Sequence, residues 1–128
     1  MKKIILFFLT LFIYNVGDAQ TLNTNDSNKI VATIYIIEGG SHTKYPYGVR
    51  SIETVGDTNK ARRICLNTVS NNFQRWNAQI KESDYFNFLA SKYCPVSADP
   101  QGHRNWLHNI QSILGTNFCA KVNALHAK

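Results

Sequence analysis

Apolar residues in the middle of the chain recur at intervals of three or four positions along one long segment. Residues with this spacing share one face of an α-helix, and so apolar a face is stable only when it is buried against other elements. Asp57 or Thr58 comes before the segment and is suited to cap the helix, because its side-chain oxygen can accept hydrogen bonds from the first free amides. The face consists of Ala61, Cys65, Val69, Phe73, Trp76 and Ile80.

The second half of the chain predicts two more helices that can cover this face. The first is capped by Ser83, with Asp84 in its first turn, and ends before a Cys-Pro pair. A loop over residues 96–102 leads to the next helix, residues 105–114, which a glycine terminates. The inward-facing residues are expected to be Phe86, Leu89, Ala90 and Tyr93 on the first helix and Trp106, Ile110, Ile113 and Leu114 on the second. The expected fold class is therefore mainly α.

Residues 30–37 are strongly apolar, but the period of their pattern is ambiguous. Their β-branched side chains favour a strand. A helix capped by Asp26 or Ser27 is the alternative, because three isoleucines also fit one helical face: Ile30, Ile34 and Ile37. Gly39-Gly40 ends the segment in either case.

The sequence that follows, up to Asp57, is rich in turn-forming residues. Tyr45-Pro46-Tyr47-Gly48 predicts a turn, and residues 49–55 are expected to form a short strand pair. The sequence therefore predicts one small domain with a short β or irregular element after the first apolar segment.

The beginning of the chain has the pattern of a secretory signal peptide. Lys2-Lys3 is followed by an apolar run over residues 4–14, and Gly17-Asp18-Ala19 provides small residues for cleavage. An uncleaved membrane anchor is the alternative, but the run is shorter than the roughly 20 residues that span a bilayer. We therefore expect residues 1–19 to be removed and residues 20–128 to form one exported domain without a stable membrane anchor, either periplasmic or secreted.

The charge balance indicates an anionic partner. The full chain of 128 residues has a formal net charge of +6, and removal of two lysines and one aspartate with the signal peptide leaves +5. A basic exported protein attracts anionic surfaces such as the cell wall or a membrane. Nucleic acid is not expected as a partner, because the basic residues are scattered and carry no nucleic-acid-binding motif. The protein is expected to be a monomer.

Three cysteines remain in the mature chain, and export permits disulfide bonds. Cys65 on the central helix and Cys94 at a helix end are the predicted pair, which leaves Cys119 free; two buried free thiols are the alternative. No CxxC or HxxxH pair is present, so we expect no metal ion and no other cofactor.

The chain resembles the lytic transglycosylases of the lysozyme-like superfamily. In that family the first helix ends in a catalytic glutamate followed by small residues, and a Gly-x-x-Gln/Ser segment lines the cleft soon afterwards. Glu38-Gly39-Gly40 matches the first feature, and Gly48 and Ser51 match the ends of the second. The resemblance extends over residues 30–114. Further stretches are similar to a subgroup associated with phage- and conjugation-linked wall hydrolases: residues 63–69, Tyr93-Cys94-Pro95, residues 97–100 and Asn105-Trp106.

The resemblance implies that a helix from about Asn28 ends at Glu38, and that Glu38 is a catalytic general acid. Cleavage of a glycosidic bond requires an acid at the leaving oxygen and stabilisation of the sugar cation. Apolar surroundings and a helix C-terminus both disfavour negative charge, which suits a proton donor. An exposed glutamate before a Gly-Gly stop is the alternative interpretation of Glu38.

A second carboxylate is harder to find in the sequence. Glu53 is the best candidate, because Asp57 and Asp84 are expected at helix starts and Asp99 lies in an Asp-Pro turn. The resemblance makes a second group unnecessary. Lytic transglycosylases use one glutamate as acid and then as base, while the 6-hydroxyl of the sugar attacks and an anhydro product forms.

The other candidate residues are expected to bind substrate. Tyr45, Tyr47 and Trp106 have amphipathic rings that can stack on sugars, although core or turn packing is the alternative for each. Gly48 and Ser51 belong to the expected cleft segment. Ser51 stands where the family usually has glutamine, so the resemblance does not define which substrate contacts this segment makes.

Two functions follow from these observations. The first is cleavage of the MurNAc-GlcNAc bond in the glycan strands of peptidoglycan, by a lytic transglycosylase or a lysozyme-like glycosidase. The alternative is a non-catalytic, exported wall-binding or accessory protein on a lysozyme-like scaffold, because a fold does not by itself imply an activity.

Overall fold

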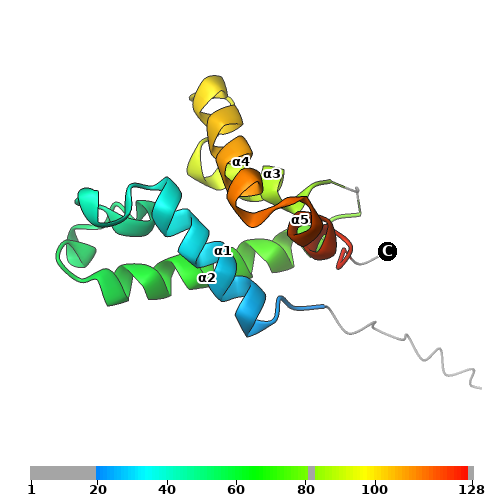
Figure 1. Cartoon of the computed structure of the whole chain (residues 1–128), viewed down its shortest axis with the longest axis horizontal. Coiled ribbons are helices and arrows are strands. Elements are labelled where there is room, and N and C mark those ends of the chain that lie inside the picture. Colours follow the sequence, from blue (N-terminus) through cyan, green and yellow to red (C-terminus); the bar gives the residue numbers. More distant parts are fainter. Residues whose placement is uncertain (1–19, 81–82, 127–128) are drawn as a thin grey trace, which may run out of the picture.

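The computed structural model describes residues 20–80 and 83–126, so the predicted signal peptide, residues 1–19, lies outside the described residues. Within those ranges the chain forms α-helices and no β-strand, which confirms the predicted mainly helical fold. Helix α1 contacts both α2 and α4, and α3 lies against α4 (Figure 1). The helices are α1 (Thr24–Ile37), α2 (Thr58–Asn77), α3 (Tyr85–Tyr93), α4 (Pro100–Leu114) and α5 (Thr116–Asn123).

The ambiguous first segment is a helix. α1 begins after Asn23, whose side-chain oxygen accepts a hydrogen bond of 2.8 Å from the Asp26 amide. Asp26 and Ser27 therefore lie inside the first turn and are not the cap that the sequence suggested. Asp26 instead pairs with the Lys121 ammonium group of α5 at 2.8 Å. The β-branched side chains fit a helix here because most of them are buried in the core: Ile30, Val31, Thr33 and Ile34.

Helix α2 carries the predicted apolar face, with one exception. Asp57 caps it by accepting a 2.9 Å hydrogen bond from the Lys60 amide. Its buried apolar residues are Ala61, Cys65, Val69, Phe73 and Trp76. Ile80, expected as the last residue of the face, is fully exposed. The helix ends at Asn77, so the three- to four-residue spacing no longer carries Ile80 to the same face.

Helices α3 and α4 begin at different residues from those predicted. Asp84, not Ser83, caps α3, and it accepts hydrogen bonds from the Phe86 and Asn87 amides at 2.7 and 3.1 Å. Ser83 instead accepts the indole N–H of Trp76, with its carbonyl oxygen at 2.9 Å and its hydroxyl at 3.0 Å.

Helix α4 extends back into the region that was predicted to be a loop. It starts at Pro100 because Asp99 caps it and proline is favoured in the first turn, where its missing N–H needs no partner. Ile113 was expected to face inward but is 47% exposed. It lies about 60° around the helix from Ile110, at the edge of the buried face.

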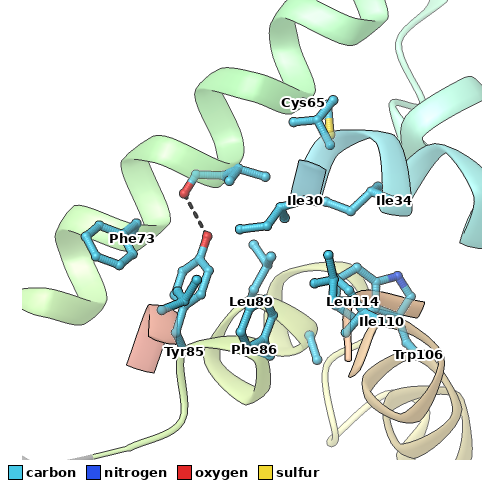
Figure 2. Close-up of a cluster of buried hydrophobic side chains, with 14 of the residues drawn as sticks. Ile30, Ile34, Cys65, Phe73, Tyr85, Phe86, Leu89, Trp106, Ile110 and Leu114 are labelled. Atoms are coloured by element: carbon cyan, nitrogen blue, oxygen red, sulfur yellow. Dashed lines mark hydrogen bonds between the residues drawn. The ribbon is translucent and has the colours of Figure 1, made fainter. Parts of the chain in front are cut away.

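The core lies where α1, α2, α3 and α4 meet. Figure 2 shows Ile30 and Ile34 of α1 between Cys65 of α2 and side chains of α3 and α4, with Phe73 beside Tyr85. Tyr85 is fully buried there, and its hydroxyl donates a 2.9 Å hydrogen bond to the Val69 carbonyl of α2 (Figure 2). This bond satisfies a polar group that would otherwise be unpaired in the core.

The segment between α1 and α2 is irregular and contains three short 3-10 turns. They are η1 (Gly40–His42), η2 (Pro46–Gly48) and η3 (Ile52–Thr54). The predicted strand pair over residues 49–55 is therefore wrong. Thr54 explains why: its hydroxyl bonds the Ser51 carbonyl at 2.8 Å and its amide bonds the same oxygen at 3.1 Å, so the backbone turns back locally and does not pair with another strand. No helix in the described part of the chain is long and apolar enough to cross a membrane.

Candidate functional site

Glu38 lies where α1 ends, as predicted, and its position is fixed by contacts from two directions. It is the C-terminal cap of α1, and its amide donates a 2.9 Å hydrogen bond to the Ile34 carbonyl. The carboxylate oxygen Oε1 accepts a 2.9 Å hydrogen bond from the indole Nε1 of Trp106 on α4. The side chain is half-buried. The packing of α4 against α1 therefore decides where this carboxylate points.

Trp106 is held in turn by Tyr93, the last residue of α3. The two rings are stacked, with centroids 4.8 Å apart and planes inclined by 16°. The Tyr93 hydroxyl lies 3.5 Å from the Cys65 sulfur on α2. These contacts thus connect the ends or faces of four helices, α1, α4, α3 and α2, through Glu38, Trp106, Tyr93 and Cys65 in turn.

The end of α3 is also attached to α4 by a buried histidine. Nδ1 of His103 lies 2.8 Å from the Cys94 carbonyl, and Nε2 lies 2.8 Å from the side-chain oxygen of Asn87. This contact fixes the backbone beside Tyr93 and, through Tyr93, the ring of Trp106.

The predicted Cys65–Cys94 disulfide is not formed, and Cys65, Cys94 and Cys119 are all free thiols. The Cys65 sulfur bonds the Tyr93 hydroxyl and not Cys94. Burial raises the pKa of Cys65 to about 11, and the nearby Glu38 carboxylate adds to the rise. Such a thiol stays protonated at neutral pH, so Cys65 is a poor nucleophile.

Gly48 of η2 lies directly against the carboxyl group of Glu38. A Cβ atom at this position would be 2.9 Å from Cδ of Glu38, 3.1 Å from its Oε2 and 3.2 Å from Cε1 of Tyr93. Gly48 also has a φ of +68°, a left-handed conformation that glycine adopts without strain. Glycine is therefore required here for two independent reasons.

Tyr47, the residue before Gly48, holds this turn in the core. Its φ of +62° is uncommon for a residue with a side chain. Its ring packs on Tyr35 of α1, with the centroids 4.9 Å apart, and only 8% of the residue is exposed. Core packing, the alternative interpretation of Tyr47, therefore accounts for most of its surface.

A cavity of about 330 Å³ lies beside the Gly48 turn. Gly48 and Tyr93 belong both to its wall and to the contacts around Glu38. Its other lining residues come from η2 and the segment after it, from α2 and from the end of α3: Tyr47, Val49, Arg50, Ile64, Thr68 and Lys92.

The structure brings some of the predicted substrate-binding residues together and separates others. Gly48 and Tyr47 line the cavity. Trp106 is 4% exposed and one face of its ring is covered by Tyr93, so it orients Glu38 and is not an open stacking surface for a sugar. Tyr45 and Ser51 are half-buried in the turns on either side and do not line this cavity.

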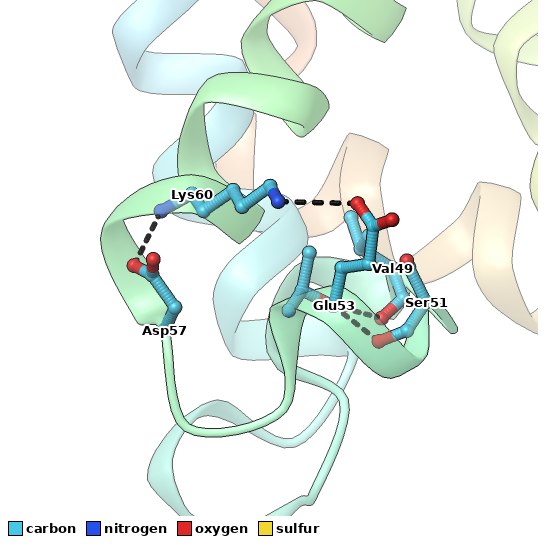
Figure 3. A network of polar contacts seen from close by, with 6 residues as sticks. Val49, Ser51, Glu53, Asp57 and Lys60 are labelled. Atoms are coloured by element: carbon cyan, nitrogen blue, oxygen red, sulfur yellow. Dashed lines mark hydrogen bonds and ion pairs between the residues drawn. The ribbon is translucent and has the colours of Figure 1, made fainter.

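Glu53, the predicted second carboxylate, faces solvent. It pairs with Lys60 at 3.2 Å, and 73% of its side chain is exposed (Figure 3). Asp57, Asp84 and Asp99 cap helices α2, α3 and α4, although only Asp57 was predicted as a cap. Among the described residues, Glu38 is thus the acidic side chain in the contacts with Trp106 and Gly48. The same part of the chain contains no group of three or more His, Cys, Asp or Glu residues that could hold a metal ion.

The sequence analysis missed the role of Tyr93 and the two cations of the cavity, Arg50 and Lys92. Tyr93 was expected only on the buried side of its helix. The Tyr93-Cys94-Pro95 stretch of the resemblance was the one signal in the sequence that pointed to this segment. The role of Tyr93 becomes visible only in its contacts with Trp106 and Cys65.

No protein family, no curated protein and no solved structure matches this chain. The similarity to lysozyme-like enzymes therefore remains an expectation from the residues quoted for it.

Proposed function

We propose that this protein cuts the glycan strands of peptidoglycan at the MurNAc-GlcNAc bond, with Glu38 as the only catalytic carboxyl group. The observation that carries the proposal is the setting of that group. It ends α1, one oxygen accepts the indole N–H of Trp106 at 2.9 Å, and the other lies toward Gly48 at the wall of the cavity. A carboxyl group held in one orientation next to the wall of a cavity suits a proton donor to a bound substrate.

The chemistry needs one carboxyl group. Protonated Glu38 gives its proton to the glycosidic oxygen, and the bond between that oxygen and C1 of the MurNAc sugar breaks. The resulting carboxylate then takes the proton of the 6-hydroxyl of the same sugar while O6 bonds to C1. The product is a 1,6-anhydro sugar, Glu38 is protonated again, and no water is consumed. The exposure of Glu53 and its pairing with Lys60 favour this route over a mechanism with two carboxylates.

The predicted export of the chain agrees with such a substrate. A signal peptide over residues 1–19 would deliver the domain to the periplasm or the exterior, where peptidoglycan lies. The +5 charge expected after cleavage would favour association with an anionic wall.

The mass of the product tests the reaction. We expect the purified protein to release fragments from peptidoglycan sacculi whose muramyl ends are lighter by one water than hydrolysis products, as measured by mass spectrometry. Reducing ends, together with loss of activity in Glu53→Gln, would instead indicate a hydrolase with two carboxylates. Binding to sacculi without any release of fragments would support the non-catalytic alternative.

Trp106→Phe tests whether the indole N–H orients Glu38. Phenylalanine keeps a ring that can stack on Tyr93 but removes the donor to Oε1, so we expect kcat to fall about tenfold or more, with a smaller change in KM. Trp76→Phe is the matched control, because it removes an indole N–H bonded to Ser83, away from Glu38. Both variants should lose stability in thermal unfolding, but only Trp106→Phe should lose activity at a temperature where both are folded. Equal activities would contradict the role given to Trp106.

A further inference from the structure

The cavity beside Gly48 has an unbalanced positive charge. Arg50, in the segment after η2, and Lys92, near the end of α3, both line it, and none of its lining residues is acidic. Both cations are exposed. The ion pairs within residues 20–80 and 83–126 are Lys60–Glu53 and Lys121–Asp26, so neither cation of the cavity is neutralised by a carboxylate there.

The rest of the wall leaves these two cations as its main polar groups. Val49, Ile64 and the ring of Tyr93 provide apolar surface. The Thr68 hydroxyl already donates a 2.9 Å hydrogen bond to the Ile64 carbonyl of its own helix. The Lys92 ammonium group lies over the Phe88 ring, 4.9 Å from its centroid, which limits the directions in which it can extend. A volume of about 330 Å³ suits a short substituent and not a glycan strand.

The position of the cavity links it to Glu38. Gly48 lies against the Glu38 carboxyl group and also lines the cavity, although Glu38 itself is not among the lining residues. Tyr93 lines the cavity too and stacks on Trp106, which bonds Glu38. A substrate with its glycosidic oxygen at Glu38 would therefore lie next to the Gly48 turn that forms part of the cavity wall.

We infer that the cavity binds a carboxylate of the short peptide that peptidoglycan carries on its muramyl sugars. The inference rests on the proposed function, because it assumes that a muramyl sugar lies at Glu38. Those peptides bear the carboxylates nearest to the glycosidic bond of the substrate. A guanidinium group binds a carboxylate through two parallel hydrogen bonds, and an ammonium group adds a second positive charge.

The test measures binding without relying on cleavage. The probe is a soluble GlcNAc-MurNAc disaccharide carrying a peptide with free carboxylates, which lacks the MurNAc-GlcNAc bond. It is compared with the same compound after amidation of its carboxylates, and binding is followed by NMR titration of the full protein. We expect the free acid to bind about fivefold or more tightly, with shifts centred on residues 47–50 and 92–93, and the difference to shrink as salt is added.

Variants separate a specific contact from general attraction. Arg50→Gln and Lys92→Gln should each weaken binding of the free acid about fivefold and leave binding of the amidated compound unchanged. Arg75→Gln is the matched control, because it removes one positive charge from an exposed position near the far end of α2 and should change neither affinity. Each variant is checked by its NMR spectrum for an unchanged fold.

The outcomes distinguish this inference from the proposed function. Equal binding of both compounds, or equal losses in all three variants, would overturn the inference even if the protein cuts peptidoglycan to anhydro products. Displacement of the free acid by an equal concentration of inorganic phosphate would also overturn it, because the cavity would then be a general anion site. Preference for the free acid that depends on Arg50 and Lys92 would support it even if sacculi are not cut.

Discussion

Replacing Glu38 by glutamine is expected to reduce the cleavage of peptidoglycan by a factor of about 10²–10⁴, the range typical for loss of a general acid–base group. Glutamine keeps the shape of the side chain and an oxygen that can accept the Trp106 indole N–H, but it delivers no proton. The fold should therefore survive. The measurement is turbidity clearing of sacculi by equal concentrations of folded protein, with thermal unfolding as the check on stability.

Three other acidic residues serve as matched controls for Glu38. Glu53→Gln removes only a solvent-exposed ion pair, which typically contributes about 0–1 kcal/mol to stability. Asp57→Asn and Asp99→Asn replace helix caps by another good capping residue. Each should keep most of the activity. Full activity in Glu38→Gln would end the enzymatic proposal in this form.

Gly48→Ala is expected to have the second-largest effect. The new Cβ would lie 2.9 Å from Cδ of Glu38, so the carboxyl group or the turn has to move. A displacement of about 1 Å in an active site can lower the rate about 10²-fold. The φ of +68° adds a backbone penalty of about 1–2 kcal/mol for any residue other than glycine. Urea unfolding and turbidity clearing measure the two effects separately.

Gly56→Ala is the control that separates strain from contact. Gly56 also has a positive φ, +82°, but a Cβ there would meet no atom within 4 Å. The Gly56→Ala variant should therefore lose only about 1–2 kcal/mol of unfolding free energy, the backbone penalty. Its activity per folded molecule should be unchanged. If Gly48→Ala and Gly56→Ala have the same activity, Gly48 does not hold the carboxyl group in place.

Features that depend on neighbours along the chain could be predicted from the sequence. The apolar spacing predicted the buried face of α2, and Asp57 was recognised as its cap, because both depend on helix geometry within a few residues. Glu38 was placed at the end of a helix from the Gly-Gly that follows it and from the family resemblance. Two errors lie at the ends of elements: Ile80 beyond the end of α2, and Ser83 in place of Asp84 as the cap of α3.

The strand pair over residues 49–55 shows how local side-chain bonding can override propensity. Val49 and Val55 favour a strand, but the hydroxyl and amide of Thr54 bond the Ser51 carbonyl and close a turn. In the first apolar segment the β-branched residues gave the same misleading signal, a preference for a strand, for a segment that is helical. There, burial of Ile30 and Ile34 against the other helices outweighs the small helix penalty of their side chains.

The sequence by itself determined that this chain is mainly helical and most of the buried faces of α2, α3 and α4. It left the first apolar segment open between a strand and a helix, and only the family resemblance placed Glu38 at a helix end. Only the tertiary structure decided what surrounds that glutamate. Trp106 reaches Glu38 across 68 positions of the chain, and Tyr93 pairs with Cys65 where a disulfide to Cys94 had been expected. Such contacts depend on how the helices are rotated and packed against one another, and that arrangement minimises the energy of the whole core. No spacing within a single segment encodes it.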